Sequence, residues 1–334
     1  MNARPASPAR SASWASRRVL LGCVLAAGAA LAISISNISL PSVYAYGGDI
    51  QTFLFARYGL AFAIAIVALA VGAHRAASTS AGAQSGARPA TFRCSASETG
   101  IATNLTALTA GVLYGLGALL TLGAIAYIPV TLAILILFTF PALTRLLEAA
   151  IERTVPTLGE TLVLVTALAG VALALDVSFA DLDRRGLAMA AGGPVCVAAS
   201  FVLSERRLNH VEAWRATALL SLGGLLVAST FAAANGAFAL PSEPGVLAFG
   251  LAIAGSTAAF IAMFAAIRFA SAALTAMLLN LEPVLTMALA IVVIGEPVGP
   301  LRIAGAALVV GSVVIATLRS GRRAPRGNGR GKKI

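Results

Sequence analysis

Four polar side chains lie inside long apolar stretches of this chain, where they could bind a solute or a proton. Glu282 and Asn280 lie two residues apart in one stretch, Arg57 lies in a second stretch and Tyr114 in a third. An ionisable side chain at the centre of a lipid bilayer costs about 2.5 to 3.5 kcal/mol, so such residues usually face a cavity and have a function. We therefore treat these four residues as candidates for binding a substrate or a coupling ion.

Glu282 is the main candidate because Pro283 follows it directly. Proline has no backbone N–H, so it frees the carbonyl of Leu279 and exposes polar backbone beside the carboxylate. Glu282 could accept a proton or bind a substrate amine; alternatively, it only makes local hydrogen bonds that stabilise a kink. Pro283 and a second proline within an apolar stretch, Pro141, are candidate hinges.

Arg57 and Tyr114 each allow more than one interpretation. Arg57 lies roughly 10 Å below the outer surface, at a helical rise of about 1.5 Å per residue. It could attract an anionic substrate group, or its guanidinium could extend to the outer headgroups. Tyr114 lies near the middle of its stretch, where its hydroxyl group needs a buried partner or a wet cavity.

The composition places these residues in a membrane. Of the 334 residues, 59% are hydrophobic and only 11% are charged, which leaves too little polar surface to cover a water-soluble globule. Ten runs are long enough to cross a bilayer as helices, and no strands of alternating polarity occur. We therefore expect an all-α integral membrane protein with ten spans. They are 19–38, 51–72, 104–125, 129–147, 157–176, 187–204, 216–236, 246–267, 271–294 and 301–318.

The distribution of basic residues predicts the orientation of these spans. If the N-terminus is cytoplasmic, 20 of the 24 Lys and Arg residues fall on the cytoplasmic side. Only Arg57, Arg184, Arg185 and Arg302 remain for the outer half. Positive charge accumulates on the cytoplasmic side of membrane proteins, so both termini are expected in the cytoplasm and the protein in the cell's inner membrane.

An internal repeat relates the two halves of the chain. The fourth and ninth predicted spans align with a constant offset of 142, which pairs Pro141 with Pro283 and Thr144 with Thr286. Beyond them, a two-residue slip aligns Glu152 with Glu296. Each half then has five spans, and because five is odd the second half must enter the membrane from the opposite side, as an inverted repeat.

These observations define four segments. Residues 1–17 are expected to be a disordered cytoplasmic N-terminus, and 319–334 a basic cytoplasmic tail. The first five-helix repeat is predicted at 18–180, with a flexible loop at 76–103, and the second repeat at 181–318.

Several motifs in both halves resemble one transporter family. Asn280-Leu281-Glu282-Pro283-Val284, Ile294-Gly295-Glu296-Pro297 and Gly305-Ala306-Ala307-Leu308 resemble the closing repeat of EamA-type carriers in the drug/metabolite transporter superfamily. Tyr127-Ile128-Pro129-Val130 with Thr139-Phe140-Pro141 resembles the matching segment of the first repeat, and second spans of that family often carry an arginine where Arg57 lies. The resemblance covers about residues 18–318.

The resemblance implies a secondary transporter that moves a small organic metabolite, such as an amino acid or a related compound, by alternating access. Efflux is the commoner direction in that family. We expect a central cavity lined by the first, third, fourth, sixth, eighth and ninth spans, with Glu282 binding a proton or a substrate cation and Arg57 assisting on the outer side. No nucleotide-binding fingerprint occurs, so ATP is not expected to drive transport directly.

An intramembrane enzyme or a membrane sensor is the alternative. Asp181-Leu182-Asp183 with Arg184-Arg185 could form a diphosphate-binding acidic cluster in an outer loop, or an ordinary solvated turn. The two histidines do not form a metal-type pair and no nucleophile elbow occurs, so we expect no enzymatic activity, cofactor or metal.

The expected partners follow from this interpretation: a small-molecule substrate, protons and membrane lipid. The basic tail suits a contact with anionic lipid headgroups, so no nucleic-acid partner is expected. The sequence leaves both a monomer and a homodimer open.

Overall fold

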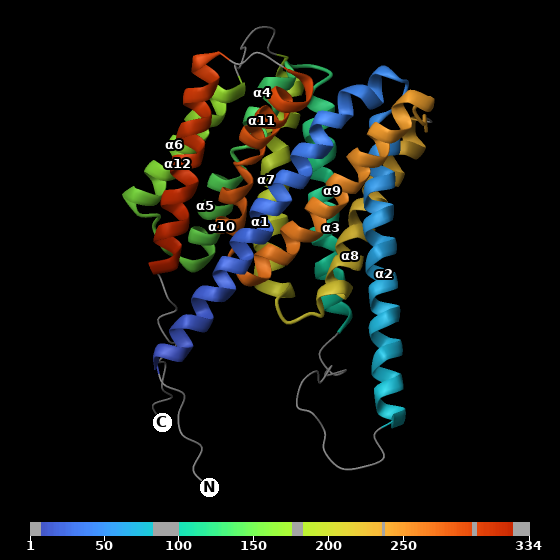
Figure 1. Cartoon of the computed structure of the whole chain (residues 1–334), viewed down its shortest axis with the longest axis vertical. Helices are drawn as coiled ribbons and strands as arrows, with labels where there is room; N and C mark the ends of the chain where they lie inside the picture. Colours follow the sequence, from blue (N-terminus) through green and yellow to red (C-terminus); the bar gives the residue numbers. More distant parts are fainter. Residues whose placement is uncertain (1–7, 83–99, 176–182, 236–237, 296–298, 323–334) are drawn as a thin grey trace.

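A computed structural model describes residues 8–82, 100–175, 183–235, 238–295 and 299–322 (Figure 1). Within these residues the chain is entirely helical and contains no strand. The helices of the first half are α1 (Pro8–Ala45), α2 (Ile50–Gly82), α3 (Ile101–Ala124), α4 (Val130–Leu137), α5 (Phe140–Glu152) and α6 (Leu158–Leu175). Those of the second half are α7 (Arg184–Leu208), α8 (Ala213–Asn235), α9 (Glu243–Phe269), α10 (Ala272–Leu279), α11 (Glu282–Ile294) and α12 (Pro300–Arg322).

These helices form ten segments that are long and apolar enough to cross a membrane, and each corresponds to one predicted span. The prediction of ten transmembrane helices is therefore confirmed. Eight spans are single helices. The fourth span consists of α4 and α5, and the ninth consists of α10 and α11, because each of these two spans is interrupted near its middle.

The two interruptions have the same cause. Pro141 is the second residue of α5 and Pro283 is the second residue of α11. A proline ring clashes with the carbonyl four residues earlier in a continuous helix, which is Leu137 in one span and Leu279 in the other. These are the last residues of α4 and α10, so each helix ends where its proline requires and a new helix begins with the proline in its first turn.

The helix bounds establish the internal repeat. Adding 142 to the first and last residue numbers of α4 and α5 gives the first and last residues of α10 and α11. Adding 142 to the first residue of α6 likewise gives the first residue of α12. Arg153 and Gly295 are paired by this offset too, and both have left-handed backbone, with φ of 53° and 74°, where α5 and α11 end. The offset therefore stays constant, and the predicted two-residue slip at Glu152 is wrong.

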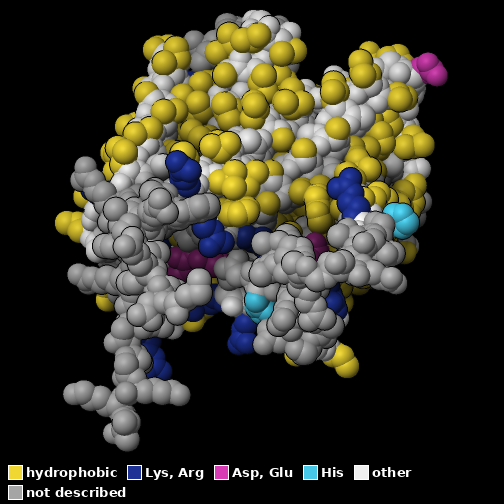
Figure 2. All heavy atoms as spheres, turned by 60° about the horizontal axis from the view of Figure 1, so that its bottom comes forward, with side chains coloured by type: hydrophobic (Ala, Val, Ile, Leu, Met, Phe, Trp, Pro, Cys, Tyr) yellow, Lys and Arg dark blue, Asp and Glu magenta, His cyan; other side chains and the backbone are white. Residues whose placement is uncertain are grey.

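The two halves have opposite directions in the bundle. In Figure 1, α4 and α11 lie in the upper part, whereas α5 and α10 lie in the lower part. The chain thus enters the fourth span from the top and the ninth span from the bottom, which confirms the inverted repeat. We call the lower end, where α1 begins and α12 ends, the basic end, because Arg and Lys side chains gather there in Figure 2.

The two repeats pack against each other, and each of the main helix pairs joins one helix of each repeat. Helix α1 packs along α9, and the equivalent pair related by the repeat is α7 along α3. Among the remaining helices, α2 packs on α8 and α6 packs on α12. Small residues allow close approach between membrane helices. A Cβ atom added at Gly305 of α12 would lie 2.6 Å from the carbonyl oxygen of Gly170 in α6, so these two backbones nearly touch.

Some predicted segment boundaries need correction. Helix α1 begins at Pro8, so residues 8–17 are helical rather than disordered, and α2 continues to Gly82 into the predicted flexible loop 76–103. Helix α12 likewise continues into the basic tail as far as Arg322. Residues 83–99 of the loop and 323–334 of the tail lie outside the described residues.

The α6–α12 contact can be tested with two alanine substitutions on one helix. Gly305→Ala would place a Cβ atom 2.5 Å from the backbone nitrogen of Ala174, whereas Gly311→Ala meets nothing within 4 Å. Overpacking costs about 1 to 3 kcal/mol, while alanine in place of a helical glycine is intrinsically favourable. We expect G305A to lower the thermal unfolding midpoint of the purified protein in detergent and G311A to leave it unchanged or raise it. Equal midpoints for both variants would contradict the packing.

Candidate functional site

Arg57 and Tyr114, two of the predicted site residues, form a buried pair between α2 and α3. Arg57 is 7% exposed, and its Nη2 donates a hydrogen bond of 3.0 Å to the Tyr114 hydroxyl group. The guanidinium carbon also lies 5.0 Å from the ring centroid of Tyr58 and 5.5 Å from that of Tyr114. Such contacts stabilise a desolvated cation. Arg57 therefore points into the bundle, and the alternative in which it extends to the outer headgroups is wrong.

The second repeat contributes to the surroundings of this pair. Thr257 of α9 donates its hydroxyl hydrogen bond to the backbone carbonyl of Arg57 at 3.2 Å. The Nε of Arg57 and the hydroxyl group of Tyr58 are buried without a hydrogen-bond partner among the described residues. The site thus retains buried polar groups that a bound solute could satisfy.

Aromatic rings extend from the Arg57–Tyr114 pair toward the basic end. Adjacent ring centroids are 5.0 to 5.8 Å apart, mostly in edge-to-face geometry, which is favourable for aromatic pairs. The row consists of Tyr58, Phe260, Tyr114, Phe264, Phe201 and Phe140. Because these rings come from both halves of the chain, the centre of the bundle is shared between the repeats.

Glu282 lies at the interruption of the ninth span, as the first residue of α11. Its Oε1 accepts a hydrogen bond of 2.8 Å from Nδ2 of Asn37 in α1, and its backbone carbonyl accepts one of 3.0 Å from the Ser34 hydroxyl group. A carboxylate in the first turn of a helix is also favoured by the helix dipole. Glu282 forms no ion pair with Arg57, although the two charges are near enough to interact electrostatically.

Asn37 was not among the predicted site residues. The available signal was a carboxamide near the end of an otherwise apolar predicted span, the same type of signal that identified Asn280. Its partner could not be inferred, because Asn37 and Glu282 are 245 residues apart in the chain.

Asn280 lies in the two-residue gap between α10 and α11. Its side chain is 3% exposed, and its Oδ1 has no hydrogen-bond partner among the described residues. At the offset that relates the repeats, the equivalent positions in the first repeat are Phe138 for Asn280 and Phe140 for Glu282. A carboxamide and a carboxylate therefore occupy only the second of the two symmetry-related interruptions, and the first has phenylalanines in their place.

The N-terminus of α10, at the basic end, is capped by three side chains that sequence analysis also missed. Glu205 of α7 accepts a 2.8 Å hydrogen bond from the N–H of Ala272, and Glu148 of α5 accepts a 3.0 Å bond from the N–H of Ala273. Ser271 is the N-cap residue and accepts a 3.1 Å bond from the N–H of Leu274. We call these three residues the α10 cap.

Ion pairs next to the α10 cap link the helices at the basic end. Arg145 of α5 lies 3.2 Å from Glu160 of α6, and Arg206 of α7 lies 2.9 Å from Glu152 of α5. Both pairs are partly exposed, so each contributes less than about 1 kcal/mol to stability. Together with the α10 cap they connect both repeats, because α5 and α6 belong to the first and α7 and α10 to the second.

The acidic outer loop of the alternative interpretation is described only in part. Asp183 is the N-cap of α7, and its carboxylate accepts a hydrogen bond of 2.7 Å from the N–H of Arg185. Asp183 therefore acts as a helix cap. Asp181 and Leu182 lie outside the described residues.

The second repeat matches a known protein family. Residues 184–318, which extend from the start of α7 into α12, match the EamA-like transporter family. Residues 184–318 therefore form an EamA-like transporter domain. The matched range includes Asn280 and Glu282, whereas Arg57, Tyr114 and Asn37 lie in the first repeat, outside it.

A solved crystal structure shares the fold of this chain. The two have a TM-score of 0.67 at 20% sequence identity, over 90% of this chain and 98% of the other. No curated protein matches the chain. The resemblance to EamA-type carriers in the drug/metabolite transporter superfamily is thus confirmed by the family match to the second repeat.

The α10 cap yields a stability test with a matched control. Ser271 and Ser242 are both N-cap serines, but only the Ser271 hydroxyl group accepts a backbone N–H of its helix. Removing such a cap costs about 0.5 to 2 kcal/mol. We expect Ser271→Ala to lower the free energy of unfolding in detergent by about 1 kcal/mol and Ser242→Ala to lower it by less. A larger loss for S242A would show that the cap does not stabilise α10.

Proposed function

We propose that this transporter is a secondary carrier that exports a small organic metabolite, such as an amino acid or a related compound, by alternating access. The observation that carries the proposal is the placement of Arg57 and Glu282. These opposite charges come from different repeats, lie within the bundle, and form no ion pair with any described residue. A zwitterionic solute has the charges to complement both: a carboxylate for Arg57 and an ammonium group for Glu282.

The two interrupted spans provide the movable elements of the proposed mechanism. Pro141 and Pro283 act as hinges at which α5 tilts relative to α4, and α11 relative to α10. The Asn37–Glu282 hydrogen bond links the repeats and is exchanged for contacts to the solute. At the basic end, the α10 cap holds α5, α7 and α10 together, so its release accompanies opening on that side.

Proton coupling is part of the proposal. An ionised carboxylate within the membrane is costly unless a cation, a proton or hydrogen bonds offset its desolvation. Asn37 supplies one hydrogen bond to the Glu282 side chain. In the proposed cycle a proton replaces the substrate ammonium group on Glu282 during the return step, which links export of one solute to entry of one proton.

The proposed orientation places the basic end in the cytoplasm of the cell, with the protein in the inner membrane. The gathering of Arg and Lys side chains at that end supports it (Figure 2).

Reporter fusions test the orientation. We expect green fluorescent protein fused after the last residue to fluoresce, and alkaline phosphatase fused after Ala239, beyond the seventh span, to be active in the periplasm of a bacterial host. The reciprocal fusions serve as controls and should be inactive. Fluorescence from the Ala239 fusion would reverse the topology.

Transport in proteoliposomes tests the function itself. Amino acids and related metabolites are screened with and without an imposed pH gradient. Because a charge-assisted hydrogen bond contributes about 1.5 to 3 kcal/mol, Arg57→Gln should weaken the apparent affinity for a transported carboxylate by at least about tenfold. Glu282→Gln should abolish the dependence of transport on the pH gradient.

Exposed residues at the non-basic end of the bundle provide matched controls. Arg185→Gln and Glu243→Gln alter the same residue types at exposed sites and should leave transport unchanged. Unaltered gradient dependence in E282Q would remove Glu282 from coupling. The absence of flux for every compound tested would count against the carrier itself.

A further inference from the structure

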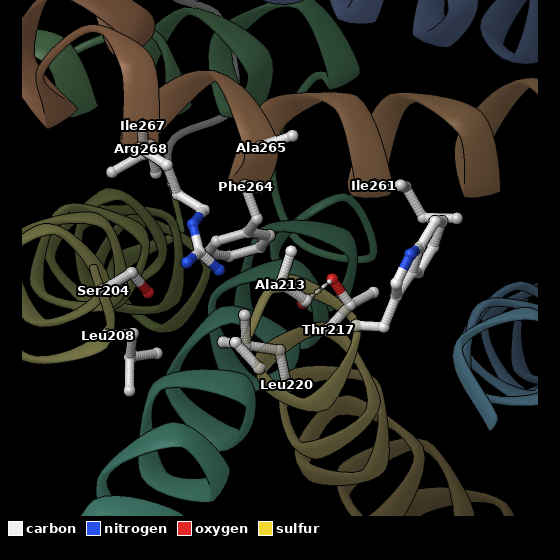
Figure 3. Close-up of a pocket in the computed structure, with 12 residues that line it drawn as sticks. Ser204, Leu208, Ala213, Thr217, Leu220, Ile261, Phe264, Ala265, Ile267 and Arg268 are labelled. Carbon is white, nitrogen blue, oxygen red and sulfur yellow. Dashed lines mark hydrogen bonds between the residues drawn. The ribbon is translucent and has the colours of Figure 1, made fainter. Parts of the chain in front are cut away.

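A small cavity lies near the basic end, between α7, α8 and α9 (Figure 3). Its volume is about 150 Å³, and most of its walls are apolar. A cavity of this size in a protein interior can hold a benzene molecule. The lining residues with polar side chains are Arg268, Ser204 and Thr217, and Trp214 adds an indole nitrogen. Thr217 is already satisfied, because its hydroxyl group donates to the carbonyl of Ala213 at 2.9 Å.

Two donors at the wall of this cavity have no partner among the described residues. Nη1 of Arg268 and the hydroxyl group of Ser204 are buried and form no hydrogen bond with any described residue. Ser204 is 6% exposed, and Figure 3 shows its hydroxyl group and the Arg268 guanidinium directed into the same space. Unsatisfied buried donors are uncommon in native proteins, and one explanation for them is a ligand that accepts their hydrogen bonds.

The guanidinium of Arg268 is held in place from its other side. Its Nη2 donates to the backbone carbonyls of Val211 and Asn209, in the connection between α7 and α8. Arg268 forms no ion pair with a described residue, and the neighbouring Glu212 uses its carboxylate to accept the N–H groups of Trp214 and Arg215. A fixed guanidinium with a free N–H beside an apolar space is suited to a carboxylate that carries a compact apolar group.

We propose that this cavity binds the carboxylate of the transported solute at the basic end, with Arg268 and Ser204 as its hydrogen-bond donors. The proposal rests on the proposed transport function and adds a second binding station to it. The apolar group of the solute occupies the space between Leu220, Ile261 and Phe264. The substrate class is thus a small carboxylate with an apolar portion about the size of a benzene ring.

Phe264 connects this station to the central site. Its ring lines the cavity and lies 5.5 Å from the ring of Tyr114, which in turn accepts the hydrogen bond of Arg57. A solute that leaves Arg57 for Arg268 must therefore pass Phe264, and rotation of that ring opens or closes the route.

Tryptophan fluorescence provides a binding assay that does not depend on transport. The chain contains two tryptophans, Trp14 and Trp214, and Trp214 lines the cavity. In a Trp14→Phe background, Trp214 is the remaining fluorophore. The probe is 4-bromobenzoate, whose bromine quenches fluorescence, with 4-bromobenzyl alcohol as the uncharged control and nanodiscs of phosphatidylcholine as the membrane.

We expect saturable quenching by 4-bromobenzoate but not by the alcohol. Arg268→Gln should weaken binding at least tenfold, and Arg215→Gln, at the same end but outside the cavity, should not change it. Because R268Q also loses contacts to Val211 and Asn209, Ala265→Phe provides a second variant that fills the cavity and should abolish quenching. Equal quenching in all variants would mean simple partitioning into the bilayer and would overturn the proposal.

Anionic lipid headgroups could supply the same chemistry, and two further measurements separate the sources. Nanodiscs containing phosphatidylglycerol should leave the affinity for 4-bromobenzoate unchanged; full competition by this lipid would identify a lipid site and overturn the solute station. R268Q should also slow the flux of the solute identified in proteoliposomes at least tenfold. Unchanged flux in R268Q would overturn the station while leaving the carrier function intact, whereas absence of wild-type flux would refute the carrier itself.

Discussion

The structure depends on one constraint: backbone polar groups that lie within a bilayer must be hydrogen-bonded inside the protein. The two interrupted spans challenge this constraint, because each leaves backbone groups free near the middle of the membrane. The chain meets it with contacts from neighbouring groups. Ser34 of α1 donates to the carbonyl of Glu282, and Thr139 donates its hydroxyl hydrogen bond to the carbonyl of Ile136 at 2.7 Å.

The same constraint explains how the repeats are arranged. Helix α1 packs on α10 and α11, and its counterpart α7 packs on α4 and α5, so each interruption is covered by the first helix of the other repeat. The N-terminus of α10 is covered in a similar way by Glu148 from the first repeat and by Glu205 from the second. Both repeats therefore contribute the contacts that surround each interruption.

The two interruptions also show how a duplicated fold acquires a one-sided site. Their helices begin and end at equivalent positions of the repeat, but Phe138 and Phe140 stand in the first where Asn280 and Glu282 stand in the second. The backbone geometry is fixed by the prolines, which leaves the side chains in the gap free to differ. The side-chain chemistry therefore differs between the repeats, while the prolines and the interruptions they cause remain alike.

Sequence reasoning recovered the features that depend on local pattern. The ten spans follow from runs of apolar residues, and the repeat follows from the spacing of Pro141 and Pro283. Glu282 and Arg57 were identified because charge within lipid is unusual. Tyr114 was also identified, but its pairing with Arg57 was not. Asn37 and Thr257 were not identified, since they reach Glu282 and Arg57 only through tertiary packing. Glu148 and Glu205 were missed because acidic residues near span ends are normally solvated, and no local signal marks them as caps of a distant helix.

The packing of α1 against the second repeat has a consequence for synthesis of the protein. Asn37 enters the membrane with the first span, but its partner Glu282 follows 245 residues later. At about 5 to 20 residues per second, that interval is roughly 12 to 50 s. During this time the carboxamide of Asn37 lacks its native partner. The surfaces of α1 that later pack on α9 and α11 also remain uncovered in the incomplete bundle. The nascent chain therefore depends on temporary shielding, by the insertion machinery or by water at the membrane surface, until the ninth span is inserted.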